Sequence, residues 1–216
     1  MMIKVDMHIH TSCSPDSLIL IDNLLENCDY KGIDCVAVTD HDTAEGALRL
    51  HEIAPSRIIV GEEIHTTSGE IIGLFLKETI QPWLSARETI ERIKDQGGLV
   101  FLPHPFDRLR GAVLDEHTRN EIYESIDIVE VYNSRNVFPW TNWKAAKFAT
   151  EKGILGGAGS DAHSRFELGR AYVVIEPFDS AADFLLKLAN AEIRGRKTPV
   201  ILNLVSKIYK TIRGIG

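Results

Sequence analysis

Two histidines at the end of the first apolar segment are spaced to bind one metal ion together. The chain begins with an apolar run that ends in Asp6-Met7-His8-Ile9-His10. In a strand, side chains two residues apart point to the same face, so His8 and His10 can reach one ion. The pair alone is a weak signal. Asp161-Ala162-His163 repeats the spacing far along the chain, and together the two pairs indicate a metal site.

Further candidate ligands follow other apolar runs. They are Asp40 and His41, Glu63 and His65, His104, and Glu130 and Asn133. In a barrel of parallel strands, the carboxyl ends of the strands converge on one rim, where active sites are built. Each residue also has an ordinary explanation: a structural histidine, a surface charge for Glu63 beside Glu62, or a helix N-cap for Asp42. Because these explanations must all hold at once, the joint pattern favours a metal site.

The ligand types indicate which metals and which chemistry to expect. Histidine and carboxylate ligands without cysteine suit Zn²⁺, Mn²⁺ or Fe²⁺. Their number exceeds the needs of one tetrahedral ion, so the sequence predicts two or three divalent ions, with a carboxylate such as Glu63 bridging. Such clusters activate a water molecule and hold the attacking and leaving oxygens of a phosphoryl displacement.

Other polar residues carry weaker signals. Arg108, Arg135 and Arg165 follow predicted strand ends and can bind phosphate bidentately, although each can also be a solvated loop charge. His51 and His117 lie in polar helical stretches and are predicted to be surface residues. Cys13 is predicted to be a small packed residue near the site, neither ligand nor nucleophile.

Short apolar runs alternate with longer amphipathic ones, which favours a parallel sheet or a barrel. The predicted strands are 3–9, 35–39, 58–64, 71–76, 99–102, 126–131, 154–158 and 172–175. The predicted helices are 17–30, 44–52, 86–96, 115–124, 140–151 and 181–191. A five-residue polar connection makes the third and fourth strands a predicted hairpin.

Composition describes an ordinary soluble chain. The 216 residues are 44% hydrophobic and 25% charged, enough for one large domain, predicted at 1–196, with a C-terminal helical appendage at 197–216. The net charge of −7 argues against general affinity for nucleic acid or anionic membranes. Three cysteines without a Cys-x-x-Cys favour a reducing cytoplasm. No apolar run approaches the roughly 18 residues of a membrane span.

Taken in order, the motifs resemble those of the PHP (polymerase and histidinol phosphatase) superfamily. They are His8-Ile9-His10-Thr11, Thr39-Asp40-His41-Asp42, Gly61-Glu62-Glu63, His104-Pro105, Glu130-Val131-Tyr132-Asn133 and Gly159-Ser160-Asp161-Ala162-His163. Any one motif is weak, whereas the ordered set, from residue 6 to about 175, is specific. The resemblance implies a distorted (β/α)7 barrel with a metal cluster on its rim.

The resemblance also implies a ligand set. The first metal would be held by His8, His10, Glu63 and Asp161. Glu63 would bridge to a second metal, with His104, and a third would take Asp16, His41 and His163. Asp40 would orient a ligand from outside the site. Many members carry a further histidine in the strand after the Glu63 motif, where this chain has Glu70-Ile71-Ile72-Gly73-Leu74-Phe75. His65 is one substitute, and occupancy of the second position stays open.

The leading functional prediction is a metal-dependent phosphoesterase acting on a small phosphorylated metabolite or nucleotide. Asp161 would act in catalysis, His41 or His163 would assist proton transfer, and Asn133 with the three arginines would bind substrate. One alternative is an exonuclease or oligonucleotide phosphodiesterase, which the acidic charge disfavours, so no stable nucleic-acid complex is expected. Others are a non-catalytic metal-binding module and an amidohydrolase-type barrel, which would want a lysine ligand. The oligomeric state is not predicted.

Overall fold

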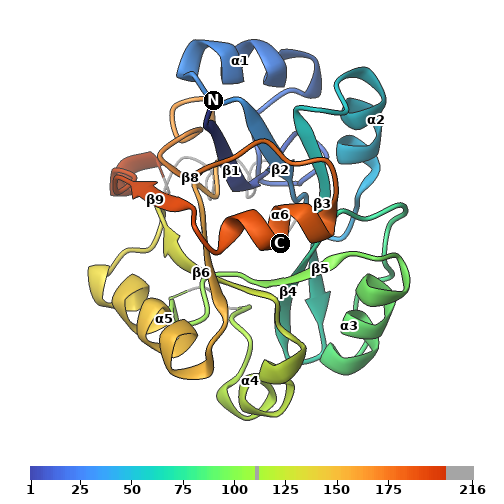
Figure 1. Cartoon of the computed structure of the whole chain (residues 1–216), viewed down its shortest axis with the longest axis vertical. Helices are drawn as coiled ribbons and strands as arrows, with labels where there is room; N and C mark the ends of the chain where they lie inside the picture. The colour runs from blue at the N-terminus through green and yellow to red at the C-terminus, as the bar shows by residue number, and fades with distance from the viewer. Residues whose placement is uncertain (110–111, 203–216) are drawn as a thin grey trace.

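The computed structural model describes residues 1–109 and 112–202, and in them nine strands form one sheet wrapped into a nearly closed barrel (Figure 1). The strands are β1 (Ile3–Ile9), β2 (Cys35–Val38), β3 (Ile58–Thr66), β4 (Gly69–Leu74), β5 (Leu99–Leu102), β6 (Ile128–Asn133), β7 (Leu155–Gly159), β8 (Ala171–Ile175) and β9 (Glu192–Gly195). Their order across the sheet is β7-β6-β5-β4-β3-β2-β1-β8-β9. The predicted α/β barrel is thereby confirmed.

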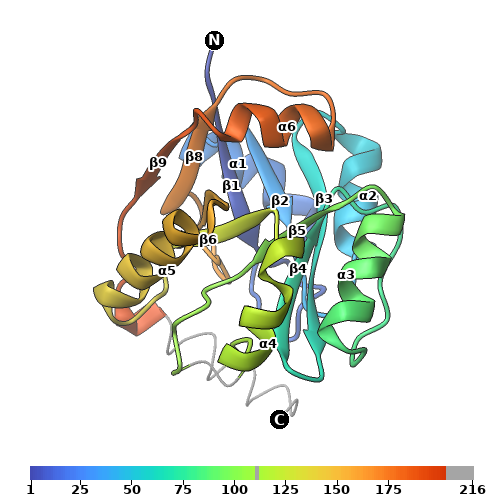
Figure 2. The same cartoon turned by 60° about the horizontal axis from the view of Figure 1, so that its bottom comes forward.

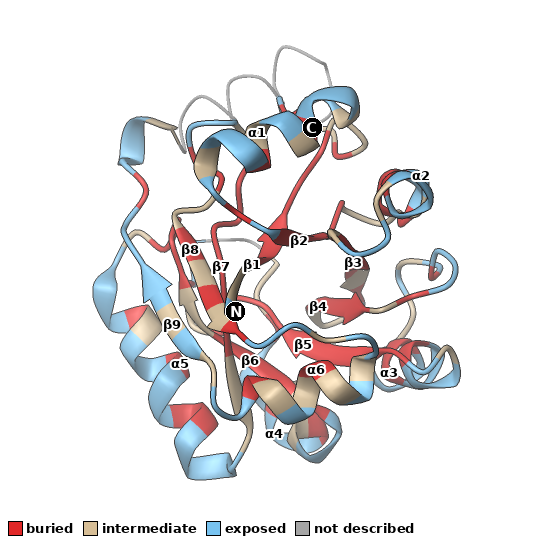
Figure 3. Cartoon of the chain, turned by 45° about the horizontal axis from the view of Figure 1, so that its top comes forward, coloured by how far each residue is buried: buried red, intermediate tan, exposed pale blue. Residues whose placement is uncertain are grey.

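Helices cover the outside of this barrel, and their exposed faces point away from it (Figures 2 and 3). They are α1 (Leu24–Lys31), α2 (Glu45–Ile53), α3 (Ala86–Asp95), α4 (Glu116–Ile122), α5 (Pro139–Lys152) and α6 (Ala181–Leu188), with short 3-10 turns at Ile21–Asn23 and Tyr123–Ser125. The best-formed start is that of α3, where Ser85 and Glu88 make a reciprocal capping box. No helix in the described ranges is long and apolar enough to cross a membrane.

The strands are not all parallel. β1, β2 and β3 run parallel, as do β5, β6 and β7. β4 is antiparallel to both of its neighbours, which confirms the predicted β3–β4 hairpin. β8 pairs antiparallel with the start of β1. The end of β1 instead faces the segment after β7, where Asp161 N donates to His8 O at 2.7 Å and His10 N donates to Ala162 O at 2.9 Å. These two hydrogen bonds join β1 to the segment after β7 and so close the barrel.

Side-chain alternation separates a barrel interior from an outer layer under the helices. On β3, Ile59 belongs to the inner apolar cluster, whereas Ile58 and Val60 belong to the outer one. Glu63 has the parity of Ile59, so its carboxylate also points inward, above the apolar filling. Phe184 of α6 belongs to the inner cluster too, so α6 closes the barrel end opposite Glu63. A register irregularity in β1 between Asp6 and Ile9 lets His8 turn inward after Met7.

The predicted elements differ from the structure at two places for physical reasons. The helix predicted at 17–30 begins only at Ile21, with an α-helix from Leu24. Ser17 Oγ donates to His10 O and Leu18 N to His163 O, so the segment is tied to the rim, and its backbone is still extended at Leu20, with ψ 136°. The sequence analysis also missed β9, because this four-residue edge strand is mostly exposed and lacks an alternating apolar pattern.

Most of the predicted C-terminal appendage, 203–216, lies outside the described residues. Within the part that is described, Thr198 packs against the barrel. Thr198 is 1% exposed, and its backbone N donates to Ser134 O at 2.7 Å, just beyond β6. The chain therefore returns to the rim after β9.

Candidate metal centre

Four side chains from three strand ends converge inside the rim. The Nε2 atoms of His8 and His10 lie 3.1 Å apart, and Glu63 Oε2 lies 3.3 Å from each. Asp161 Oδ1 lies 3.5 Å from His10 Nε2 and 3.9 Å from His8 Nε2. A tetrahedral ion with bonds of about 2.0–2.1 Å sets its ligand atoms about 3.3 Å apart. The four donors are therefore spaced as the ligands of one ion are.

Glu63 reaches beyond this first group. Its other oxygen, Oε1, lies 3.0 Å from His104 Nε2, and Oε2 also lies 3.3 Å from His41 Nδ1. His104 is 1% exposed and has a left-handed backbone, with φ 28°. Glu63 thus presents one oxygen to His104 and the other to His8, His10 and His41.

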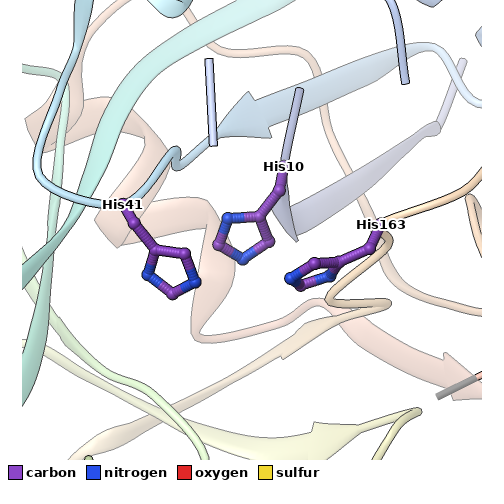
Figure 4. Close-up of side chains that lie close together, drawn as sticks. All are labelled: His10, His41 and His163. Carbon is purple, nitrogen blue, oxygen red and sulfur yellow. The ribbon is translucent and has the colours of Figure 1, made fainter. Parts of the chain in front are cut away.

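A third group of side chains surrounds His10, whose ring lies between those of His41 and His163 (Figure 4). The His10 ring centroid lies 4.6 Å from that of His41 and 4.3 Å from that of His163. Asp16 Oδ2 lies 3.3 Å from His163 Nε2 and 3.8 Å from His41 Nε2. Asp16 had the weakest sequence signal of the predicted ligands, yet the loop after β1 carries it to this histidine group.

A layer of hydrogen bonds holds the histidines and carboxylates in place from outside. Glu130 Oε1 lies 3.1 Å from His8 Nδ1. Asn133 Nδ2 donates to Glu130 Oε2 at 2.9 Å and to Asp161 Oδ2 at 3.0 Å. Such partners fix the orientation and tautomer of metal-binding side chains. Asn133 is therefore positioned to orient Asp161, whereas the sequence analysis expected it to touch substrate.

The other histidine of the first pair is held through a serine. His10 Nδ1 lies 3.1 Å from Ser14 Oγ, which donates to Asp40 Oδ1 at 2.8 Å. Thr11 donates to Asp40 from both its backbone N and its hydroxyl, at 2.6 and 2.5 Å. Asp40 thus acts on His10 indirectly, by orienting the loop and the serine that touch it.

Electrostatics leave two histidines neutral beside charged carboxylates. Burial and His163 lower the pKa of His10 to about 4, and burial and His10 lower the pKa of His41 to about 4. Burial alone would lower the pKa of His8, but nearby carboxylates, Glu63 foremost, raise it well above its usual value. Metal ligands must be deprotonated, and His10 and His41 meet this condition at neutral pH.

The residues present fit divalent metal ions. In the described part of the chain, His41 Nδ1 and Asp16 Oδ1 are buried without a hydrogen bond. Each such orphaned atom costs about 1–3 kcal/mol, a cost that coordination to an ion removes. Buried carboxylates also need a nearby positive charge. The nitrogen and oxygen donors are those that Zn²⁺, Mn²⁺ and Fe²⁺ accept.

The predicted phosphate-binding arginines are placed differently from one another. Arg135 is 8% exposed; its Nε lies 3.3 Å from Glu167 Oε1, and its Nη1 contacts Asp161 and His163. Arg108 is 88% exposed and pairs with Glu116. The structure does not bring Arg108 to the histidines, nor Arg165, whose exposed guanidinium lies over the Phe166 ring. Phosphate binding by these arginines stays a prediction.

Several site residues had no place in the sequence-derived ligand set. Glu70, at the start of β4, lies 3.1 Å from His65 Nε2 through Oε1. Asp42, expected to be a helix N-cap, instead accepts from His65 N and lies 3.0 Å from His65 Nδ1. Glu167 is fully buried against Arg135. The predicted hairpin was the available signal for Glu70, because it returns the start of β4 to the rim. His51 and His117 are exposed, as predicted.

A nearly closed α/β barrel with buried histidines and carboxylates on its rim is an arrangement typical of metal-dependent hydrolases. The chain belongs to the PHP family. The PHP domain model matches residues 6–136 and the PHP-associated model matches residues 139–193. An uncharacterized protein of Methanocaldococcus jannaschii is 36% identical over 96% of this chain and 87% of that protein.

Solved structures with the same fold share little sequence. A two-domain protein from Bacteroides vulgatus containing a predicted PHP-like metal-dependent phosphoesterase has a TM-score of 0.73, with 17% identity over 97% of this chain and 70% of that one. A lesion-specific endonuclease from Pyrococcus furiosus has a TM-score of 0.64, with 18% identity over 89% of this chain and 58% of that one. At such identities the likeness concerns the fold alone.

Proposed function

We propose that this protein is a metal-dependent phosphoesterase that hydrolyses a small phosphorylated metabolite or nucleotide. The observation that carries the proposal is the spacing of His8, His10, Glu63 and Asp161, with donor atoms 3.1 to 3.9 Å apart. Together with the bridging position of Glu63, this geometry supports a cluster of two or three divalent ions. When bound, such ions polarise phosphate oxygens and lower the pKa of water.

The chain's own residues supply the positioning. His104 would hold the second ion with Glu63, and Asp16, His41 and His163 the third. Arg135 would fix Asp161 and His163 through the contacts that it already makes with them.

His41 or His163 would assist proton transfer when its Nε2 atom is not committed to the third ion. His163 Nε2 and His41 Nε2 both face the half-buried Asp16 carboxylate, the more accessible side of the cluster. His41 is 19% exposed in its side chain, compared with 0% for His8 and His10. A substrate approaching from solvent would therefore meet His41 before the His8–His10 pair.

The test is phosphate release from sugar phosphates, nucleotides and nucleoside bisphosphates by protein loaded with Mn²⁺ or Zn²⁺, repeated after chelation. Asp161→Asn keeps the shape of the side chain but removes the charge of a proposed ligand, and it should abolish turnover. The control is Asp34→Ala, which changes an exposed aspartate just before β2, at the end of that strand away from the metal centre. This variant should retain full activity.

The same screen separates the alternatives. Full turnover by Asp161→Asn would contradict the proposed site. Cleavage of long single-stranded nucleic acid with strong salt dependence, without release from small substrates, would favour a nuclease. Bound metal without hydrolysis of any phosphate ester would favour a non-catalytic metal-binding module.

A further inference from the structure

Glu70 brings a second carboxylate to the side of the cluster where Glu63 meets His104. β4 runs antiparallel to β3, so its first residues lie at the rim where β3 ends, and Glu70 pairs with His65 across the ladder. The Glu70 side chain is 6% exposed, and its Oε2 lies 4.0 Å from His104 Nε2. Donor atoms of Glu63, Glu70 and His104 all lie within 4.8 Å of one another.

His65 holds the Glu70 carboxylate in this orientation. Its Nε2 lies 3.1 Å from Glu70 Oε1, and its Nδ1 lies 3.0 Å from Asp42 Oδ2. The indole of Trp83 stacks on the ring, with centroids 5.4 Å apart and an interplanar angle of 26°. His65 is thus fixed on three sides and engages the Glu70 oxygen remote from His104. Supporting partners of this kind orient metal-binding carboxylates in proteins.

An independent observation points to a cation beside Glu70. His41 Nδ1 is buried and makes no hydrogen bond to the described residues. It nevertheless lies 3.7 Å from Glu70 Oε1 and 3.3 Å from Glu63 Oε2. His41 Nδ1 thus faces the oxygen of each carboxylate that points away from His104 and hydrogen-bonds to neither, as expected where a cation between Glu63 and Glu70 offsets their charge.

We propose that Glu70 completes a second metal position with Glu63 and His104, and that His65 is a positioning residue for Glu70 rather than a ligand. β4 itself, Gly-Glu-Ile-Ile-Gly-Leu, contains no histidine, so a carboxylate takes the place where many relatives are expected to use an imidazole. Two carboxylates and one imidazole suit Mn²⁺ and leave coordination sites for water or substrate. The inference rests on the metal centre of the proposed function, but it concerns metal binding and not turnover.

The experiment counts bound ions. Metal-free wild type, Glu70→Gln, His65→Ala and Glu62→Gln are titrated with Mn²⁺, and binding is followed by electron paramagnetic resonance and elemental analysis. Glu62→Gln is the matched control, because Glu62 is a buried glutamate next to Glu63 that accepts from Ile80 N and belongs to no ligand group. Wild type and the control should bind the same number of ions.

Glu70→Gln should bind one Mn²⁺ fewer than wild type, while its remaining Mn²⁺ shows that the chain is folded. His65→Ala should keep the wild-type number but bind the second ion about 10–100-fold more weakly, as for other supporting residues. An unchanged number and affinity in Glu70→Gln would overturn the proposal, as would loss of a whole ion in His65→Ala alone. Wild type that binds both ions without hydrolysing phosphate esters would refute the proposed function and leave this inference standing.

Discussion

Gly159 is the position where adding one methyl group should damage the metal centre most directly. It ends β7 beside His8, and a Cβ built there would lie 2.3 Å from His8 Cβ, 2.8 Å from Glu130 Oε1 and 2.9 Å from His8 N. Carbon atoms pack at about 3.5–4.0 Å. The Gly159→Ala variant must therefore move β7 away from β1 by roughly 1 Å, because two of the three neighbours are a backbone atom and a Cβ that no rotamer change can move.

The expected cost follows from this overlap. Forcing an extra carbon into a packed interior costs about 1–3 kcal/mol, and Gly159→Ala should fall at the upper end, at about 3 kcal/mol, because backbone has to move. Displacing His8 also moves Nε2 away from Glu63 and His10, and every 1.4 kcal/mol lost from metal binding lowers the affinity about tenfold. The variant should therefore lose both stability and metal.

The control is Gly156→Ala on the same strand. The three atoms nearest to its Cβ would belong to side chains, Val131 Cγ2 at 3.0 Å and Cγ1 at 3.3 Å and Ile193 Cδ1 at 3.5 Å, and because these can shift, the cost should lie at the lower end of the range, at about 1 kcal/mol. Both changes reduce the conformational entropy of the unfolded chain by the same amount. The difference between the two variants in free energy of unfolding therefore reports the overlap at His8. Urea unfolding in chelator gives the stabilities, and elemental analysis gives the metal content. Equal stability and full metal content in both variants would refute this reasoning.

Two further outcomes follow from the buried charges. Chelation should lower the melting temperature of wild type by about 5–15 °C, because ions present at 100–1,000 times their dissociation constant contribute about 2.7–4.1 kcal/mol; an unchanged melting curve would mean that no ion is bound. Burial raises the pKa of Glu62 from 4.5 to about 8. Between these pH values the folded chain binds one proton more than the unfolded chain, so the free energy of unfolding falls as pH rises, until Glu62 has lost its proton above about pH 8. Glu62→Gln in chelator should therefore gain stability relative to wild type from pH 5 to 9 in urea titrations, and a pH-independent difference would contradict a protonated Glu62.

Strand alternation was enough to pair His8 with His10, although the register irregularity that turns this pair inward after Met7 is not readable from it. His8, His10 and Asp161 sit at strand ends, where a two-residue period and the convergence of a barrel rim decide which side chains meet. Glu70 was not predicted as a ligand because the reasoning considered only residues at the ends of parallel strands, and β4 runs antiparallel to β3. A hairpin brings the start of its second strand to the same rim as the end of its first, so Glu70 was accessible to reasoning from the predicted turn.

Other features depend on contacts that no local pattern encodes. Residues 17–20 have a helical pattern, but hydrogen bonds from Ser17 and Leu18 to the rim override it. Asn133 and Arg135 follow a strand end as substrate-binding residues often do, and spacing did not foresee that their side chains contact Glu130, Asp161 and Glu167; their binding of substrate stays a prediction. The direction of a loop side chain is set by its tertiary partners, and these are not readable from spacing.

The first metal position also bears on how the barrel closes. The two backbone hydrogen bonds between the end of β1 and the segment after β7 involve His8, His10, Asp161 and Ala162. Three of these four residues are also proposed ligands, and the fourth proposed ligand, Glu63, comes from β3 across the interior. An ion held by these four residues would connect β1 and the segment after β7 to β3 across the barrel interior, just above the inner apolar cluster. The proposed metal ligands are therefore also residues that complete the fold, so loss of the ion should loosen the contact between β1 and the segment after β7 before it affects the hairpin of β3 and β4.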